Sequence, residues 1–314
     1  MKFAVISDIH GNLEALETVL SDAEAQRVDG YILLGDYCLS NPEPDACVTR
    51  IRNLPNTHVI RGNEERYFET LMHQDQRTWT DGQMEISYWC YRNLSPENRA
   101  YLLSLPQRLE LTGDGVPLHI AHSSAEFIGD REHREWGTWV VSERYPHGYI
   151  SFEAFTRDIH RYFDRDAQFQ QRLSELPPGV YLFGHCHIQW HYASDDGRVV
   201  LLDAGSCGLP LECVKDSIPY TILELTDGTV RVEERRLPFD FTAYVERFRQ
   251  SRQYREAPVW SRVIARQLSQ SRDCLVFFLQ FVERYAQQIG DDRRPYVRET
   301  WEQAYDLWES AISP

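Results

Sequence analysis

Five short polar clusters, each at the end of an apolar run, contain the residues of this chain that could perform chemistry. Their candidate metal ligands are Asp8, His10, Asp36, Asn63, His122, His185 and His187. Imidazole nitrogen binds Mn, Fe, Co, Ni and Zn, and carboxylate or amide oxygen suits the harder ions of that group. The set therefore favours a pair of divalent ions, at which a phosphate ester is hydrolysed by in-line attack of metal-bound water.

The positions of the clusters predict a sheet that brings them together. Each cluster follows an apolar, β-prone run of four to six residues, which is typical of a buried strand. A helical apolar spacing over residues 13–20 separates the first two of these strands. Since α/β proteins place their chemistry in loops beyond the strand ends, we expect the five loops to converge on one edge of the sheet.

The C-terminal region carries a different pattern. A hairpin is predicted through Asp227-Gly228, and it is followed by two apolar stripes with helical spacing, around Val282 and Trp308. The stripes contain no ligand chemistry, so they must be buried against the core, each other or a second subunit. We expect this region to shape the assembly or shield the site.

The order of the motifs, Asp-x-His, Gly-Asp, Gly-Asn-x-acid, His and Gly-His-x-His, resembles the calcineurin-like metallophosphoesterases. The small bacterial and archaeal phosphodiesterase branch is similar in its opening run, Ser7–Asn12, and in the segments 94–111 and 203–210. The resemblance implies an α+β fold, a four-layer αββα sandwich with a C-terminal helical appendage. We expect a metallophosphoesterase domain at 1–238, with insertions at about 66–93 and 124–176, and a helical region at 239–314 packed on it.

The resemblance also implies a division of the ligands between two metal ions. The first metal would take Asp8, His10, Asp36 and His187. The second metal would take Asp36, Asn63, His122 and His185. Asp36 would then bridge the ions, beside a bridging hydroxide that acts as the nucleophile. We expect Mn²⁺ first, with Fe, Zn, Ni or Co as alternatives.

One departure from the family pattern concerns position 64. Many relatives have a histidine there that helps to protonate the leaving group, whereas this chain has Glu64. A carboxyl with an ordinary pKa of ~4.3 is ionised at neutral pH and cannot donate a proton. Burial would raise that pKa and a nearby metal pair would lower it. The departure favours phosphodiesters or phosphoanhydrides with good leaving groups.

Several neighbours of the ligands are candidates for substrate binding. Arg61 precedes Gly62-Asn63, and its guanidinium could bind two phosphate oxygens, although a structural ion pair with a nearby acid is an equally weighted alternative. The other candidates are Asn12, Tyr37 and Ser123. The residues expected to act in catalysis are Asp36, Asn63, His122, Arg61 and Glu64.

The predicted function is hydrolysis of a phosphodiester or phosphoanhydride, with nucleotides or dinucleoside polyphosphates as a substrate class. A phosphomonoesterase acting on proteins or small molecules is the alternative. A non-catalytic binding scaffold with this fold is disfavoured, because such scaffolds tend to lose ligands and all seven positions are filled here.

Composition restricts the partners and the compartment. A net charge of −15 opposes a broad electrostatic grip on nucleic acid. Seven cysteines without a Cys-x-x-Cys pair indicate a reducing compartment, and neither a leader nor a run of ~20 apolar residues is seen. We expect a cytoplasmic protein that acts on a phosphorylated small molecule or nucleotide. We expect no membrane and no extended nucleic acid as partners, and homo-oligomerisation stays open.

Overall fold

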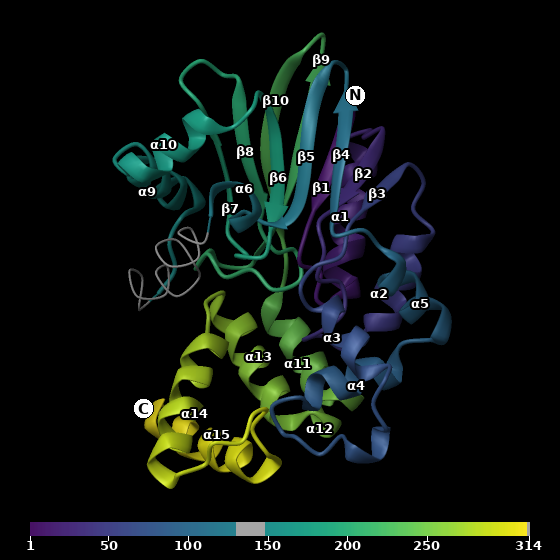
Figure 1. The fold of residues 1–314 in the computed structure, drawn as a ribbon, viewed down its shortest axis with the longest axis vertical. Helices are drawn as coiled ribbons and strands as arrows, with labels where there is room; N and C mark the ends of the chain where they lie inside the picture. Colours follow the sequence, from purple (N-terminus) through teal and green to yellow (C-terminus); the bar gives the residue numbers. More distant parts are fainter. Residues whose placement is uncertain (130–147, 313–314) are drawn as a thin grey trace.

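Two five-stranded sheets form the centre of the computed structural model, which describes residues 1–129 and 148–312 (Figure 1). The first sheet has the order β10-β9-β1-β2-β3, with β1 Lys2–Ile6, β2 Gly30–Leu33, β3 Thr57–Val59, β9 Ser217–Thr226 and β10 Thr229–Pro238. The second sheet has the order β4-β5-β6-β8-β7, with β4 Arg108–Gly113, β5 Val116–Ser123, β6 Gly179–Gly184, β7 Gln189–Ala193 and β8 Val199–Ala204.

Both sheets have a parallel centre and antiparallel additions. In the first sheet β1, β2 and β3 are parallel, and the hairpin β9–β10 joins β1 in the antiparallel sense. In the second sheet β5, β6 and β8 are parallel, and β4 and β7 are antiparallel edge strands. Parallel neighbours end at the same side of a sheet, so the loops that follow β1, β2, β3 and β6 can meet.

Helices cover the outer face of each sheet. Those that follow strands of the first sheet are α1 Leu13–Ala25, α2 Pro44–Arg52, α3 Glu65–Leu71, η1 Gln76–Thr78, α4 Glu85–Asn93 and α5 Pro96–Ser104. Those on the second sheet are α6 Ala125–Ile128, α9 Phe152–Phe163 and α10 Ala167–Glu175. The helix expected over residues 13–20 is therefore confirmed as α1.

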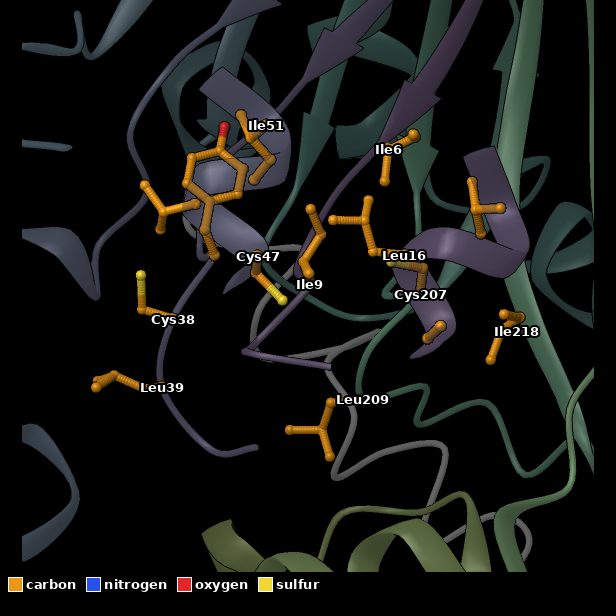
Figure 2. Close-up of a cluster of buried hydrophobic side chains, with 14 of the residues drawn as sticks. Ile6, Ile9, Leu16, Cys38, Leu39, Cys47, Ile51, Cys207, Leu209 and Ile218 are labelled. Carbon is orange, nitrogen blue, oxygen red and sulfur yellow. The ribbon is translucent and has the colours of Figure 1, made fainter. Parts of the chain in front are cut away.

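Three apolar clusters hold these layers together. Between the sheets, side chains such as Val5, Ile32 and Leu182 are fully buried. A second cluster joins the first sheet to its helices, and Figure 2 shows part of it around Ile9 and Leu16. A third joins the second sheet to α9 and α10. Burial of both faces of both sheets confirms the four-layer αββα sandwich.

The expected convergence of the five loops needs one correction. The ligand-bearing strands belong to two sheets rather than one, since β1, β2 and β3 lie in the first and β5 and β6 in the second. The two sheets pack face to face, so the carboxyl ends of both supply the site. In addition, His122 is inside β5, beside an irregularity in its pairing with β6.

The C-terminal helices lie beyond the end at which β6 terminates, below the sheets in Figure 1. They are α11 Phe241–Gln250, α12 Arg252–Glu256, α13 Pro258–Gln270, α14 Leu275–Ile289 and α15 Arg298–Ile312. The apolar face of α11 enters the cluster beneath the first sheet. The two predicted stripes are α14 and α15, which share a cluster with part of α13. The region thus packs on the core and on itself.

The two predicted insertions differ in how they pack. Residues 66–93 form most of α3, with η1 and α4, and their aromatic residues Trp79, Tyr88 and Trp89 are buried in the cluster beneath the first sheet. Residues 124–176 contain α6, α9 and α10, and the stretch 130–147, with its two tryptophans, lies outside the described residues. In the described ranges, no helix is long and apolar enough to cross a membrane.

Candidate metal centre

Five of the seven predicted ligands have a left-handed backbone. The φ angles of Asp8, His10, Asp36, His185 and His187 lie between 52° and 73°. This region is uncommon for residues with a side chain, and costs of order 1–3 kcal/mol at each position. Such strain persists only when the surrounding structure imposes it, and it gathers at functional sites. The loops are therefore shaped to aim side chains rather than to relax the chain.

The first ligand cluster contains Asp8, His10 and His187, all buried. Asp8 Oδ2 accepts hydrogen bonds from the hydroxyl of Ser7 at 2.5 Å and the backbone nitrogen of His185 at 2.9 Å. Asp8 Oδ1 has no hydrogen bond within the described part of the chain. It faces His187 Nε2 at 3.2 Å and His10 Nε2 at 3.6 Å. One carboxylate oxygen is thus fixed, and the other points at two imidazoles.

The orientation of these imidazoles identifies what fits between them. His10 Nδ1 lies 3.1 Å from the carbonyl of Leu39, and His187 Nδ1 lies 2.8 Å from the carbonyl of Leu209. A carbonyl oxygen can only accept a hydrogen bond, so the Nδ1 atom of each ring must be the donor and carries the hydrogen. The Nε2 lone pairs then face one another at 3.0 Å, beside Asp8 Oδ1. Three acceptors that converge in a buried space fit a metal cation.

The second ligand cluster has the same design. His122 Nδ1 lies 2.7 Å from the carbonyl of Leu34, which leaves Nε2 as an acceptor. That Nε2 lies 3.2 Å from Asp36 Oδ2 and 3.0 Å from Asn63 Oδ1. His185 completes the cluster, with ligand atoms of Asp36, His122 and His185 all within 4.8 Å of one another.

Asp36 lies between the two clusters. Its carboxylate also lies within 4.8 Å of ligand atoms of His10 and Glu64, on the side of the first cluster. Asp36 Oδ1 accepts a hydrogen bond from the backbone nitrogen of Glu64 at 2.9 Å. Gly62 allows this approach, because a Cβ there would come within 2.0 Å of Asp36 Oδ1. Asp36 is thus close to ligand atoms of both clusters, and the division of the ligands between two ions stays a prediction.

The electrostatics of the site require additional positive charge. Burial alone would lower the pKa of His122, but the carboxylate of Asp36 outweighs it and raises the pKa to about 10. At His10, burial is likewise outweighed by Glu64 and Asp8, so its pKa rises. The buried carboxylates therefore favour positive charge beside them. A divalent ion would supply this charge, and each Nε2 would then bind the ion in its neutral form.

The two glutamates after Asn63 form hydrogen bonds that position the predicted ligands. Glu64 Oε2 lies 3.1 Å from His10 Nδ1, an arrangement in which a carboxylate orients a metal-binding imidazole. Glu65 is fully buried and accepts three backbone hydrogen bonds, from Asp36 at 3.1 Å, Tyr37 at 2.8 Å and Gly62 at 2.7 Å. This role of Glu65 was not predicted from the sequence. The feature that could have indicated it is an acidic residue directly after the ligand loop.

The predicted substrate-binding residues Arg61, Asn12 and Tyr37 have partners within the chain. Arg61 pairs with Glu69, which is the structural alternative weighed above. Asn12 caps α1 through Ala15 and donates to the carbonyl of Gly208. The hydroxyl of Tyr37 is buried and donates to the carbonyl of Ile60. None of these three, nor Ser123, is among the described residues that line the pocket next to the ligands.

A pocket of about 460 Å³ opens over the two clusters. Its ligand side comprises His10, Asp36, Asn63, His185 and His187, with Glu64 beside them. Much of the remaining lining comes from the loop after β8 and from the C-terminal helices, through Leu209, Leu211, Gln267, Asp273, Leu275, Val276 and Leu279. The C-terminal helical region was expected to shape the assembly or shield the site, but none of its individual residues was predicted to line a pocket.

The C-terminal helices also support a ligand loop. Gln253 of α12 donates to the carbonyl of Ser40 at 2.8 Å, and the hydroxyl of Tyr244 donates to Asn41 at 3.2 Å. Ser40 lines the pocket and follows Asp36 by four residues. The helical region is thus attached to the loop that carries the central ligand.

Comparison with known proteins agrees with this geometry. The sequence model of the calcineurin-like phosphoesterase superfamily domain matches residues 1–228, and the chain belongs to this superfamily. An uncharacterized protein of Methanocaldococcus jannaschii is 24% identical over 262 residues, which cover 79% of this chain and 92% of that protein.

Two solved structures have a similar fold. A metallophosphoesterase from Sphaerobacter thermophilus superposes with a TM-score of 0.56 and 23% identity, covering 86% of this chain and 100% of the other. A hypothetical protein from Pyrococcus horikoshii superposes with a TM-score of 0.57 and 17% identity, covering 84% and 97%. Coverage of 84–86% of this chain places part of the C-terminal helical region, as well as the sandwich, within the shared fold.

Proposed function

We propose that this chain is a phosphodiesterase or phosphoanhydride hydrolase that holds two divalent metal ions. The observation that supports it best is the convergence of buried acceptors in two clusters, with Asp36 of the second cluster also close to His10 of the first. The first ion would bind Asp8, His10, Asp36 and His187, and the second would bind Asp36, Asn63, His122 and His185. Imidazole with carboxylate and amide oxygen suits Mn²⁺ and its neighbours.

The two ions would polarise the phosphoryl oxygens and acidify water. The chain itself contributes orientation. The carbonyls of Leu39, Leu209 and Leu34 fix the tautomers of three imidazoles, and Glu64 assists at His10. A ligand shell that is fixed before the ions bind keeps its geometry through the reaction, which is how a site stabilises charge that develops at phosphorus.

The expected preference for diesters or anhydrides follows from the side chains that surround the metal ligands. Glu64 occupies the position at which many relatives have a histidine, and its carboxylate is committed to His10. Among the described pocket residues, every histidine is a proposed ligand, and neither lysine nor tyrosine is present. Because no described pocket residue is a lysine, a tyrosine or a histidine outside the proposed ligands, hydrolysis should depend on substrates whose leaving group departs as a stable anion.

The test compares four substrates with the Mn²⁺-loaded protein. Bis-p-nitrophenyl phosphate should be hydrolysed faster than p-nitrophenyl phosphate, and both faster than an alkyl monoester such as glycerol phosphate. A dinucleoside polyphosphate serves as the anhydride substrate. Metal analysis of the same sample should give two ions per chain. The proposal fails if the loaded protein binds no more than a trace of metal, or if alkyl monoesters are its best substrates.

A further inference from the structure

The pocket over the ligands has an apolar side that the hydrolytic chemistry does not use. Leu275, Val276 and Leu279 of α14 line it together with Leu209 and Leu211 from the loop after β8. Leu209 and Leu211 are almost fully buried, whereas the three residues of α14 are partly exposed. Five aliphatic side chains therefore line, together with metal ligands, a space of about 460 Å³, a volume typical of small-molecule sites.

Core packing accounts for only part of the apolar character of these three residues. The face that carries Phe278, Val282 and Ala286 is buried against α13 and α15. Leu275 and Leu279 pack against the edge of that cluster and also line the pocket, whereas Val276 lines the pocket and is not part of the cluster. Val276 is thus an aliphatic, partly exposed residue that the core does not use, and an aliphatic surface beside a charged centre indicates a ligand that contributes apolar area.

The start of α14 is also not a phosphate site. Gln267 Oε1 accepts hydrogen bonds from the backbone nitrogens of Cys274 at 2.8 Å and Leu275 at 3.0 Å. Asp273 Oδ1 accepts one from the backbone nitrogen of Val276 at 2.9 Å. The first amides of the helix, which could otherwise bind an anion, are satisfied within the chain, and a carboxylate stands beside them. This side of the pocket therefore favours neutral groups.

The apolar side is fixed relative to the ligands. The backbone nitrogen of Cys213 donates to the carbonyl of Ser271 at 2.7 Å, which attaches the turn before α14 to the loop after β8. In that same loop, the carbonyl of Leu209 orients His187 while its side chain lines the pocket. Figure 2 shows Leu209 at the lower edge of the buried cluster, on the side of the C-terminal helices. The apolar side thus forms part of the site.

On the basis of the proposed function, we propose that α14 and the loop after β8 form a subsite for an aliphatic ester substituent of the phosphate substrate. A nucleobase is disfavoured because bases stack on aromatic rings, and no aromatic side chain is among the described pocket residues. A polyphosphate is disfavoured because these residues include no lysine or arginine, while Asp273 and Glu64 add negative charge. The substrate would be a phosphodiester with one aliphatic arm in this subsite.

The test uses two diesters with the same leaving group, methyl p-nitrophenyl phosphate and hexyl p-nitrophenyl phosphate. Because p-nitrophenolate leaves from both, their kcat/KM ratio reports the alkyl arm. Each methylene moved out of water can contribute up to about fourfold, so the hexyl ester should be favoured by at least about tenfold. A parallel binding measurement compares hexylphosphonate with methylphosphonate on the Mn²⁺-loaded protein by calorimetry.

Variants connect the preference to the proposed residues. Leu279→Gln and the nearly isosteric Val276→Thr should each reduce the hexyl-to-methyl ratio about fivefold or more, in hydrolysis and in phosphonate binding. Leu307→Gln is the matched control, because Leu307 is 50% exposed on α15 and is not a pocket residue. It should leave both ratios unchanged. Metal content is measured for every variant, so that a damaged metal site is recognised.

The outcomes separate the two proposals. Equal hydrolysis of both diesters together with equal binding of both phosphonates overturns the subsite and leaves the proposed function standing. Tighter hexylphosphonate binding that depends on Leu279, without hydrolysis of either diester or of the dinucleoside polyphosphate, supports the subsite and contradicts the proposed function. Faster turnover of thymidine 5′-p-nitrophenyl phosphate than of the hexyl ester would show that the pocket prefers a nucleoside, and the aliphatic assignment would be wrong.

Discussion

Glu65 Oε2 accepts a hydrogen bond from the backbone nitrogen of Asp36 at 3.1 Å, although 29 positions separate the two residues. The same carboxylate accepts from Tyr37 and from Gly62, so it joins the loop after β2 to the loop after β3. Each loop carries a proposed ligand. A single buried side chain thus sets the separation of Asp36 and Asn63 before any ion binds.

Replacing Glu65 by glutamine should therefore damage both stability and metal binding. An amide presents one acceptor oxygen and one NH₂ group, and the NH₂ group would face a backbone N–H that needs an acceptor. We expect Glu65→Gln to lower the free energy of unfolding by about 2–4 kcal/mol and to reduce metal content. Urea denaturation and metal analysis measure the two effects.

Glu69→Gln provides the matched control for that substitution. The side chain of Glu69 is 49% exposed and pairs with Arg61, and exposed ion pairs contribute at most about 1 kcal/mol. The control should remain within that margin and keep its metal. If both variants lost stability and metal equally, Glu65 would not have the bridging role assigned to it.

The two aspartate ligands should differ in their effect on metal stoichiometry. Asp36 belongs to the second cluster and also lies within 4.8 Å of a ligand atom of His10 in the first, whereas Asp8 belongs to the cluster with His10 and His187. We expect Asp36→Asn to weaken both sites because it removes the shared negative charge, and Asp8→Asn to weaken mainly one. Metal analysis after dialysis should give close to zero ions per chain for the first variant and close to one for the second. Identical stoichiometries would argue against a shared Asp36.

Much of the fold could be predicted because its signals are local. Each ligand directly follows or ends a short apolar run, so strand positions and ligand order could be derived from the same residues. Side-chain direction could not be derived in this way. Tyr37 directly follows Asp36, yet its hydroxyl reaches the carbonyl of Ile60 in the interior. Arg61 precedes a ligand loop, yet it pairs with Glu69 eight positions later.

The apolar side of the pocket illustrates a second limit. Leu275 and Leu279 belong to the same stripe in the sequence as Phe278 and Val282, since all four have helical spacing. In the structure the stripe divides, because Phe278 and Val282 are fully buried while Leu275 and Leu279 border the pocket. Helical spacing indicates which residues share a face. It does not indicate whether that face meets a core or a ligand, which depends on tertiary contacts.

Position 64 allows a test of leaving-group preference. Glu64→His would place an imidazole where many relatives have one, and we expect activity toward alkyl monoesters to rise by on the order of 10²-fold if that imidazole reaches the leaving oxygen. Glu64→Gln is the control, because it can still accept from His10 Nδ1 but adds no proton donor. Steady-state rates on glycerol phosphate and bis-p-nitrophenyl phosphate give the comparison. A similar rise in the glutamine variant would mean that loss of negative charge, rather than general acid catalysis, limits monoester hydrolysis.

Glu85 should make stability depend on pH at the contact between α4 and the C-terminal helices. It is almost fully buried and accepts a hydrogen bond from the backbone nitrogen of Trp260 at 2.7 Å, and burial raises its pKa to about 7. A carboxyl whose folded pKa exceeds its unfolded value of 4.5 stabilises the fold in its protonated form. That contribution is complete below about pH 4.5 and is lost as the pH rises to about 7, by roughly 3 kcal/mol.

Glu85→Gln stays neutral, so its stability relative to wild type should increase by up to that amount between pH 5 and pH 8. Urea denaturation of both proteins at the two pH values measures the difference, and a constant difference would show that Glu85 titrates normally.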